Sequence, residues 1–216
     1  VVAETHPLYM GLYSGALGRE EVTKYVEGSD CVLMFGTFMT DINLGIYTAE
    51  LDMSDCILVT SEQLRIRHHH YHDVTLQDFV QTLAARKPRP KSTPPKAPTD
   101  FWKEPFTLRP NDKITITRMI DRLDEQLEDD TVVIADVGDA LFGATELTTR
   151  GHTEFLSPAY YTSMGFAVPA ALGVHMARPA ARAVAIVGDG AFQRAGMELS
   201  SLVRYKLPPI GIVLDN

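Results

Sequence analysis

The stretch from Ala183 to Asn216 constrains the fold more than any other part of the chain. Ala183–Val187 is a short apolar run with β-branched residues, which predicts a buried strand. The triplet Gly188-Asp189-Gly190 interrupts this run, and apolar residues then recur at helical spacing. Pro208-Pro209 ends the helix before a second apolar run, Ile210–Leu214. The order strand, glycine turn, helix, strand therefore predicts two parallel strands joined by a crossover helix.

Polar side chains follow both of these predicted strands. The carboxyl ends of parallel strands share one edge of a sheet, so we expect Asp189 and Asn216 to converge there. Two such oxygen donors suit a Mg²⁺ ion that keeps phosphate oxygens in its shell. The free N–H groups of Gly190 and Ala191 suit the phosphates themselves. Gly188 and Gly190 permit positive φ and let the backbone approach a ligand closely, although an isolated GDG can be only a turn.

The spacing from this GDG to Asn216 resembles the thiamine diphosphate signature. ADVGDALFGA (135–144) and SPAYYTSMGFAVPAALG (157–173) resemble segments of thiamine diphosphate-dependent 2-keto acid decarboxylases, which act on pyruvate, indolepyruvate or phenylpyruvate. ETHPLYMGLYSGALGREEV (4–22) and VLMFGTFMTDINLGIYT (32–48) resemble the middle domain of the same enzymes. The resemblance implies thiamine diphosphate and Mg²⁺ as cofactors, and conversion of a 2-keto acid into an aldehyde and CO₂.

Two other functions stay open at this point. Acetolactate synthase-like carboligases share the architecture, so the resemblance also fits an enzyme that joins two substrates. A catalytically silent α/β binding or assembly module is the third hypothesis for the chain taken alone.

The resemblance also implies a role for individual residues. Asp189 and Asn216 correspond to metal ligands, and Asp139 to a residue against the diphosphate, although a helix cap explains Asp139 equally well. Met164 corresponds to the apolar wedge that bends the cofactor, but it could be a core residue. The backbone carbonyl of Thr162, at a position often occupied by glycine, could accept a hydrogen bond from the aminopyrimidine. The implied cofactor-binding set is Gly138, Asp139, Thr162, Ser163, Met164, Gly188, Asp189, Gly190, Ala191 and Asn216.

The family's proton relay has no counterpart here. Its activating glutamate and histidines lie in an N-terminal domain, and a further glutamate lies beyond the GDG…N motif. We therefore assign no catalytic residue, and expect Asn216 to be a truncation point and this fragment alone to be inactive. Because each active site of the family forms between two subunits, we expect a homodimer or homotetramer in the intact enzyme.

Composition narrows the class of protein further. The chain has 216 residues, 45% of them hydrophobic, which is enough for one large domain or two small ones. The net charge of −8 without a basic stripe argues against nucleic acid as a partner. There is no apolar run of transmembrane length, and VVAETHPLY lacks the features of a signal peptide. We therefore expect a soluble cytoplasmic protein without a membrane partner.

The order of predicted elements gives an α/β fold with two parallel-sheet units. We expect a middle domain over 1–86, a linker over 87–111 and the first half of the diphosphate domain over 112–216. In the first unit, strands near Cys31–Phe35 and Cys56–Thr60 alternate with helices near Glu20–Glu27 and Leu76–Ala85. In the second, Ile114–Leu127 is amphipathic and precedes a strand at Val132–Ala135.

The linker is identified by its proline content. Residues 86–111 hold seven of the 13 prolines and seven of the 20 basic residues, a density that excludes regular helix. We expect Phe101, Trp102 and Phe106 to pin part of it to a domain surface.

Two further groups of side chains could bind metal. His68, His69, His70 and His72 are close in sequence, but LRIRHHHYH is also typical of an edge strand with surface histidines, which we favour. Cys31 and Cys56 each open an apolar strand, and we expect buried free thiols rather than a disulfide or a metal pair.

Overall fold

The computed structural model describes residues 4–89, 93, 95–99 and 105–215. The predicted α/β class is confirmed, because helices cover two sheets that both contain parallel strands. The chain divides into two compact units, Met10–Phe101 on the one hand and Val1–Tyr9 together with Trp102–Asn216 on the other. The sequence boundaries at 86 and 112 stay predictions.

The unit formed by Met10–Phe101 contains a mixed sheet of order β1-β2-β3-β4. The helices are α1 (Glu20–Glu27) and α2 (Leu76–Arg86), and the strands are β1 (Val32–Phe35), β2 (Cys56–Val59), β3 (Gln63–Ile66) and β4 (His69–His72). Strands β1 and β2 are parallel as expected, whereas β3 and β4 are added antiparallel. The ring of Phe79 on α2 lies 6.0 Å from that of Phe35 on β1, so α2 packs against this sheet.

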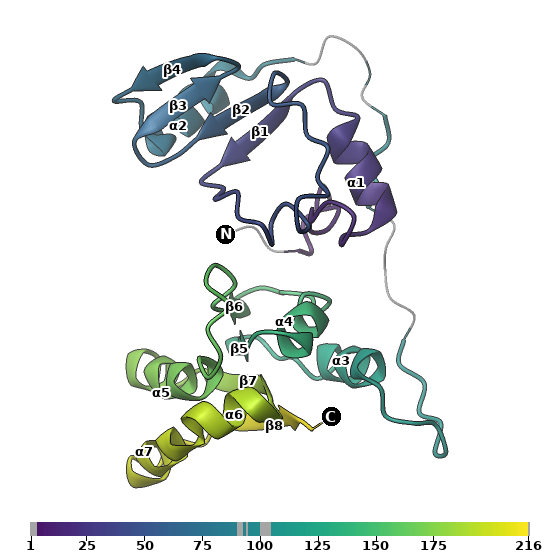
Figure 1. The fold of residues 1–216 in the computed structure, drawn as a ribbon, viewed down its shortest axis with the longest axis vertical. Coiled ribbons are helices and arrows are strands. Elements are labelled where there is room, and N and C mark those ends of the chain that lie inside the picture. The colour runs from purple at the N-terminus through teal and green to yellow at the C-terminus, as the bar shows by residue number, and fades with distance from the viewer. Residues whose placement is uncertain (1–3, 90–92, 94, 100–104, 216) are drawn as a thin grey trace. The chain divides into compact units, whose positions relative to one another are not determined.

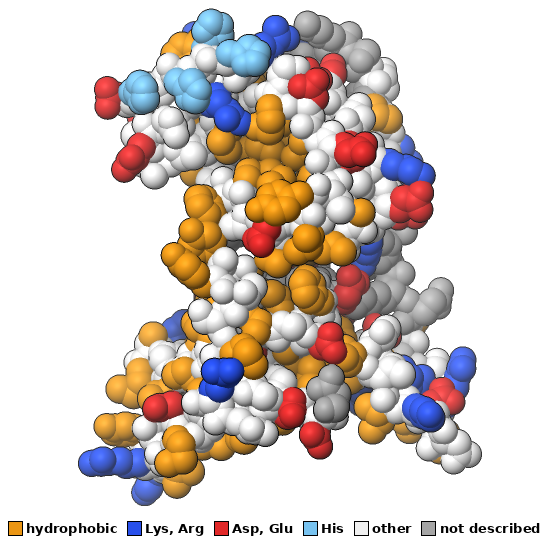
Figure 2. All heavy atoms as spheres, viewed as in Figure 1, with side chains coloured by type: hydrophobic (Ala, Val, Ile, Leu, Met, Phe, Trp, Pro, Cys, Tyr) orange, Lys and Arg blue, Asp and Glu red, His pale blue; other side chains and the backbone are white. Residues whose placement is uncertain are grey.

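The four neighbouring histidines lie on and beside a β-hairpin. The predicted single strand is divided by a turn in which Arg67 has φ 55°, and His68 lies outside both strands. The edge strand β4 is exposed along its whole length, and Figure 2 shows the histidines on the surface of this unit. Within the described ranges, no three His, Cys, Asp or Glu side chains cluster closely enough to hold a metal ion. The interpretation as surface histidines is therefore favoured.

The C-terminal unit is built on a fully parallel sheet of order β6-β5-β7-β8. Its strands are β5 (Thr131–Ala135), β6 (Glu154–Leu156), β7 (Arg182–Gly188) and β8 (Ile210–Leu214). Strands β7 and β8 are adjacent and parallel, as the sequence predicts, with Val184 opposite Ile210 and Gly188 opposite Leu214. The helices are α3 (Ile116–Asp124), α4 (Asp139–Ala144), α5 (Ala167–Ala177), α6 (Asp189–Ala195) and α7 (Leu199–Arg204).

Helices cover both faces of this sheet (Figure 1). Val132 and Ile134 of β5 pack with Ala171 of α5, while the alternate residue Val133 packs with Ile120 of α3. Because successive residues of a strand face opposite sides, a strand buried on both faces must be apolar throughout. All five residues of β5 are indeed buried, which places its carboxyl end between the two helical layers.

The helix that follows the GDG turn is interrupted. Instead of one continuous helix, α6 passes through a 3₁₀ turn, Gly196–Glu198, into α7, which ends before Pro208-Pro209. Only Leu202 among the apolar residues used to predict this helix is buried, while Met197 and Val203 are 83% and 77% exposed. The apolar spacing therefore predicted helix correctly but not the side that faces the core.

The described residues of the proline-rich segment beyond Arg86, which ends α2, form no helix or strand. Phe106 lies under two guanidinium groups of α3, with Arg118 at 5.2 Å and Arg122 at 5.8 Å from the ring centroid. Its backbone N–H donates to Glu125 Oε1 at 2.6 Å. The expectation that Phe106 pins the segment is confirmed, whereas Phe101 and Trp102 lie outside the described residues.

The first described residues belong to the C-terminal unit. Glu4 N–H donates to the carbonyl of Thr149, and Thr149 N–H donates to Glu4 Oε2 at 2.8 Å. The hydroxyl of Tyr9 donates to Glu4 Oε1 at 2.6 Å. Residues 4–9 are thus tied to the loop before β6.

Both cysteines are free, as expected, but they differ in exposure. Cys56 is buried at the start of β2, whereas Cys31, one residue before β1, is exposed, so the expectation that both are buried is wrong for Cys31. Among the residues that the structure describes, none of the helices combines the length and apolar character needed to cross a membrane.

Candidate functional site

The order in which strands are added to the C-terminal sheet reverses beside β5. From β5 the chain passes through α4 to β6 on one side, and then returns through α5 to β7 on the other side of β5. The connection that leaves the carboxyl end of β5 runs toward β6, whereas the one that leaves the carboxyl end of β7 runs the other way, through α6 and α7 to β8. A crevice therefore opens between these two strand ends. This topological switch point is where ligands bind in open α/β sheets.

A pocket of about 680 Å³ lies at this edge. Segments from several elements meet in it: Val137, Gly138, Asp139 and Ala140 after β5, Gly188, Asp189, Gly190 and Ala191 at the end of β7, and Val213, Leu214 and Asp215 at the end of β8. The structure therefore brings together six of the ten residues implied by the resemblance from the two strand ends, and Met164 also lines the pocket.

The GDG turn connects β7 directly to α6. Gly188 precedes the helix with φ −71° and ψ 155°, and Gly190 is already in its first turn. Neither glycine adopts the positive φ that a glycine permits. A Cβ placed on Gly188 would meet no atom within 4 Å, and the backbone is therefore open to a ligand. The N–H groups of the first turn have no partner within the helix, which is the general basis for anion binding at helix N-termini.

The turn after β5 does need a glycine. Gly138 has φ 74° and ψ −143°, a region that other residues rarely adopt, and a Cβ at this position would meet nothing within 4 Å. Asp139 is the first residue of α4, and Gly138 occupies the N-cap position, so the alternative that Asp139 caps the helix is wrong. Its exposed side chain instead belongs to the pocket wall.

Three carboxylates line the pocket, those of Asp139, Asp189 and Asp215. Within the described part of the chain, no hydrogen bond or ion pair engages any of their side chains. Asn216, the second metal ligand expected from sequence, lies outside the described residues. The pocket is therefore acidic on the side where the strands end.

Met164 reaches the pocket from the loop before α5. It is 47% exposed, which argues against the alternative that it is a core residue. Its Cε lies 3.6 Å from the position that a Cβ on Gly190 would occupy, so the side chain lies over the GDG turn. Thr162 and Ser163, in the same loop, are exposed but are not among the residues that line the pocket. Thr162 has φ 50°, a conformation in which glycine avoids strain.

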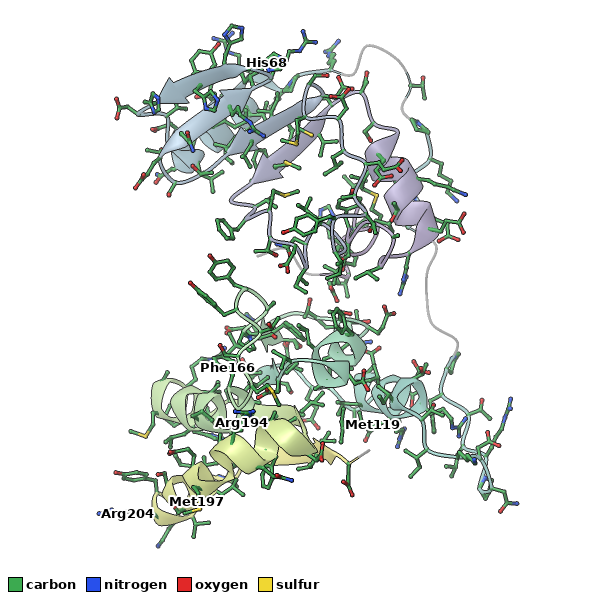
Figure 3. The ribbon with its side chains drawn as sticks, viewed as in Figure 1. His68, Met119, Phe166, Arg194, Met197 and Arg204 are labelled. Carbon is green, nitrogen blue, oxygen red and sulfur yellow. The ribbon has the colours of Figure 1, made fainter. Side chains whose placement is uncertain are left out.

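Sequence reasoning missed the wall contributed by the start of α3. Ile114, Thr115, Ile116 and Met119 line the pocket, where they add apolar side chains to those of Val213 and Leu214. Met119 is labelled on α3 in Figure 3. The amphipathic pattern of Ile114–Leu127 was visible, but only the strand order places the beginning of this helix beside β5 and β7.

Two family models match most of the chain. Residues 130–216 match the model described as thiamine pyrophosphate enzyme, C-terminal TPP binding domain. Residues 1–86 match the model described as thiamine pyrophosphate enzyme, central domain. The first match contains every pocket residue outside the start of α3. The second includes residues 4–9, which the structure groups with the C-terminal unit.

Curated relatives match along the whole chain. Indole-3-pyruvate decarboxylase of Azospirillum brasilense is 31% identical over 99% of this chain and 39% of its own length. Pyruvate decarboxylase isozyme 1 of Saccharomyces cerevisiae is 28% identical over 100% of this chain and 39% of its own length. Alpha-keto-acid decarboxylase of Mycobacterium leprae is 30% identical over 99% of this chain and 38% of its own length. The chain thus spans about two fifths of the length of these relatives.

Proposed function

Since the chain belongs to the thiamine pyrophosphate enzyme family, we propose that its C-terminal pocket holds thiamine diphosphate through Mg²⁺ in an enzyme that decarboxylates a 2-keto acid. The observation that supports this most strongly is the pocket at the switch point between β5 and β7, where Asp139 and the GDG turn meet. The names of the relatives favour a 2-keto acid of the pyruvate or indolepyruvate type as the substrate, and the sequence resemblance adds phenylpyruvate.

The two turns at the carboxyl edge suit a diphosphate. The amides of Gly190 and Ala191, in the first turn of α6, are proposed to donate to its oxygens. Gly138 and Gly188 leave open space where other residues would place a Cβ, so the backbone can approach the phosphates closely. Size and shape at this edge therefore fit the group.

The charges of the pocket require a cation if a diphosphate binds. Asp139, Asp189 and Asp215 would repel phosphate oxygens a few ångströms away unless a divalent cation lies between them. Mg²⁺ prefers oxygen ligands and retains phosphates in its shell. We propose Asp189 as its anionic ligand and Asn216 as a neutral one, as the family motif implies.

Met164 is proposed to support the bent cofactor. Its methyl group lies over Gly190, beside the proposed diphosphate position, so the side chain can fill the space between the two rings. When bound, thiamine diphosphate supplies a carbon nucleophile that attacks the keto group and accepts the electron pair left by CO₂. The residues of this chain bind and orient the cofactor, and Ile116 and Met119 provide an apolar wall that excludes water.

We propose that this chain alone does not turn over a 2-keto acid. The described residues that line the pocket include neither glutamate nor histidine, so they offer no obvious proton relay. An acetolactate synthase-like carboligase remains the alternative, and acetaldehyde or acetolactate as the product from pyruvate would distinguish the two. Assembly as a homodimer or homotetramer and residence in the cytoplasm stay predictions.

The cofactor site can be tested by titrating the metal-depleted protein with thiamine diphosphate at a fixed Mg²⁺ concentration. Asp189→Ala removes a charged ligand, and losing such a contact costs about 1.5–3 kcal/mol, or roughly ten- to hundredfold in affinity. Asn216→Ala should have a smaller effect because it removes a neutral oxygen. Asp30→Ala, an exposed aspartate of the other unit, is the control for charge. Unchanged affinity in Asp189→Ala, with a native circular dichroism spectrum, would remove the basis of the proposal.

A further inference from the structure

Asp136 is a fully buried carboxylate at the end of β5. It is 0% exposed, and the resemblance assigns it no role. Its backbone N–H donates to the carbonyl of Ile186 at 2.8 Å, which extends the pairing of β5 with β7. The residue therefore lies directly beneath the switch point, next to both turns that enter the pocket.

The side chain of Asp136 is saturated with backbone donors. Oδ1 accepts from Val137 N–H at 3.0 Å and from Gly165 N–H at 3.1 Å, and Oδ2 accepts from Ala167 N–H at 2.9 Å. Ala167 is the first residue of α5, where a negative charge interacts favourably with the helix dipole. Three N–H groups and a helix N-terminus thus hold a carboxylate that has no basic partner among the described residues.

Gly165, one of the three residues bonded to Asp136, directly follows Met164. Gly165 has φ 92°, and a Cβ there would lie 3.2 Å from Ala195 Cβ and 3.4 Å from Arg194 Cβ, so its backbone is pressed against α6. Figure 3 labels the neighbours on either side of this contact, Phe166 at the start of α5 and Arg194 on α6. With Gly165 fixed between Asp136 and α6, the preceding residue Met164 projects over Gly190.

We propose that Asp136 is a positioning residue of the pocket: its buried carboxylate fixes the Met164–Gly165 backbone and so holds the Met164 side chain over the GDG turn. The consequence for cofactor binding rests on the function proposed above. An amide cannot replace the carboxylate, because it has only one accepting oxygen for donors that now reach both Oδ1 and Oδ2. The substitution Asp136→Asn would turn an NH₂ group toward one of these N–H groups.

The position of Met164 can be measured without any cofactor. The chain has eight methionines, so labelling with ¹³C-methyl methionine gives a simple spectrum in which Met164→Leu identifies the Met164 signal. We expect a nuclear Overhauser contact between the Met164 methyl and the Gly190 α-protons in the wild type, and its loss in Asp136→Asn. Asp124→Asn is the matched control, because Asp124 is also buried in this unit and also accepts from a backbone N–H, that of Thr148. The control should lose stability but keep the Met164–Gly190 contact.

A second arm measures thiamine diphosphate binding in Mg²⁺ by calorimetry. We expect about tenfold weaker binding in Asp136→Asn than in Asp124→Asn, from the loss of charge-assisted positioning. If the wild type binds no thiamine diphosphate, the proposed function fails, while the methyl contact still decides the role of Asp136. A folded Asp136→Asn variant that retains the Met164–Gly190 contact would overturn the proposal.

If Asp136→Asn does not fold, hydrogen exchange of the backbone amides in the wild type still tests the proposal. The amides of Gly165 and Ala167 should exchange far more slowly than that of the exposed Ser163 in the same loop, because the carboxylate holds them. Equal exchange rates would show that the carboxylate does not fix the loop, and would refute the proposal.

Discussion

The guanidinium of Arg150 lies 2.9 Å from the carboxylate of Asp124, which is 9% exposed at the end of α3. Thr148 N–H donates to the same carboxylate at 2.6 Å, and Arg150 also reaches the Asp124 carbonyl at 3.0 Å. One buried acid thus joins α3 to the loop that leads into β6. The neighbouring residue of that loop, Thr149, holds Glu4.

Asp124→Ala should be more destabilising than Arg150→Ala. Removing the Asp124 side chain leaves the Thr148 N–H without its acceptor and the guanidinium with backbone carbonyls only, which should lower the free energy of unfolding by about 2–3 kcal/mol. Removing Arg150 leaves the carboxylate bonded to Thr148 and should cost about 1–2 kcal/mol, because the guanidinium is partly exposed. Urea unfolding followed by circular dichroism measures both. Equal losses of unfolding free energy in the two variants, or a larger loss in Arg150→Ala, would contradict the central role of Asp124 in these hydrogen bonds.

Thr162→Gly should stabilise the C-terminal unit. A β-branched residue at φ 50° is strained, whereas glycine adopts this conformation freely. The hydrogen bond from the residue-162 N–H to the carbonyl of Pro158 is kept. We expect a gain of about 0.5–1 kcal/mol in thermal unfolding, since the relief of strain exceeds the entropic cost of glycine. Ser163→Gly, at a position without positive φ, is the control and should be destabilising. A loss of stability in Thr162→Gly would count against this backbone conformation.

His175→Leu should leave the fold unchanged or make it more stable. The imidazole is 5% exposed on α5, and its Nε2 is buried with no partner among the described residues. An unsatisfied buried polar atom costs about 1–3 kcal/mol, which an apolar side chain of similar size avoids. Chemical unfolding at neutral pH measures the change, with the exposed His152→Leu as the comparison. A loss above about 1 kcal/mol would show that Nε2 has a partner after all.

The two cysteines should react at very different rates. Burial, and secondarily the nearby carboxylates of Asp52 and Asp55, raise the pKa of the Cys56 thiol, so less of the reactive thiolate is present at a given pH. Cys31 is exposed. With excess iodoacetamide at pH 8, mass spectrometry should find Cys31 alkylated first and Cys56 only after denaturant is added. Because a raised folded pKa favours the neutral thiol, this protection should fade as the pH rises. Simultaneous alkylation at pH 8 would place Cys56 outside the core.

The local sequence was sufficient to predict the bounds of elements whose residue pattern fits a single type of secondary structure. The bounds of α1 and β8 agree with the predicted ones, and β7 extends the prediction by one residue at each end. A strand buried on both faces, as β7 is, must be apolar throughout, so it stands out in a sequence. Strand β8 is partly exposed, but Pro208-Pro209 marks its start. The meeting of Asp139 with Asp189 follows from the rule for parallel strands once β5 and β7 are adjacent.

Other features depend on contacts that no local pattern records. The turn of the histidine-rich hairpin places Arg67 in the left-handed backbone conformation. Because this position is not a glycine, nothing in the local sequence signalled a turn. Met197 and Val203 have the spacing of a buried face yet are exposed, because α6 breaks before α7 and only Leu202 turns inward. The roles of Asp136 and Met119 depend on which segments the strand order brings beside them. Periodicity gives the type of an element, but its neighbours are fixed by topology.

The hydrogen bonds between Glu4 and Thr149 join two separate stretches of the chain into one C-terminal unit. In topological terms, Met10–Phe101 is an insertion into that unit. The chain enters the insertion after Tyr9 and returns to the C-terminal unit at Trp102. A subclone that starts after the proline-rich segment would omit the acceptor of the Thr149 amide, although it would contain every residue that lines the pocket. Dissection of this protein at a single site between Tyr9 and Thr149 would therefore separate Glu4 from the residue to which it is hydrogen-bonded.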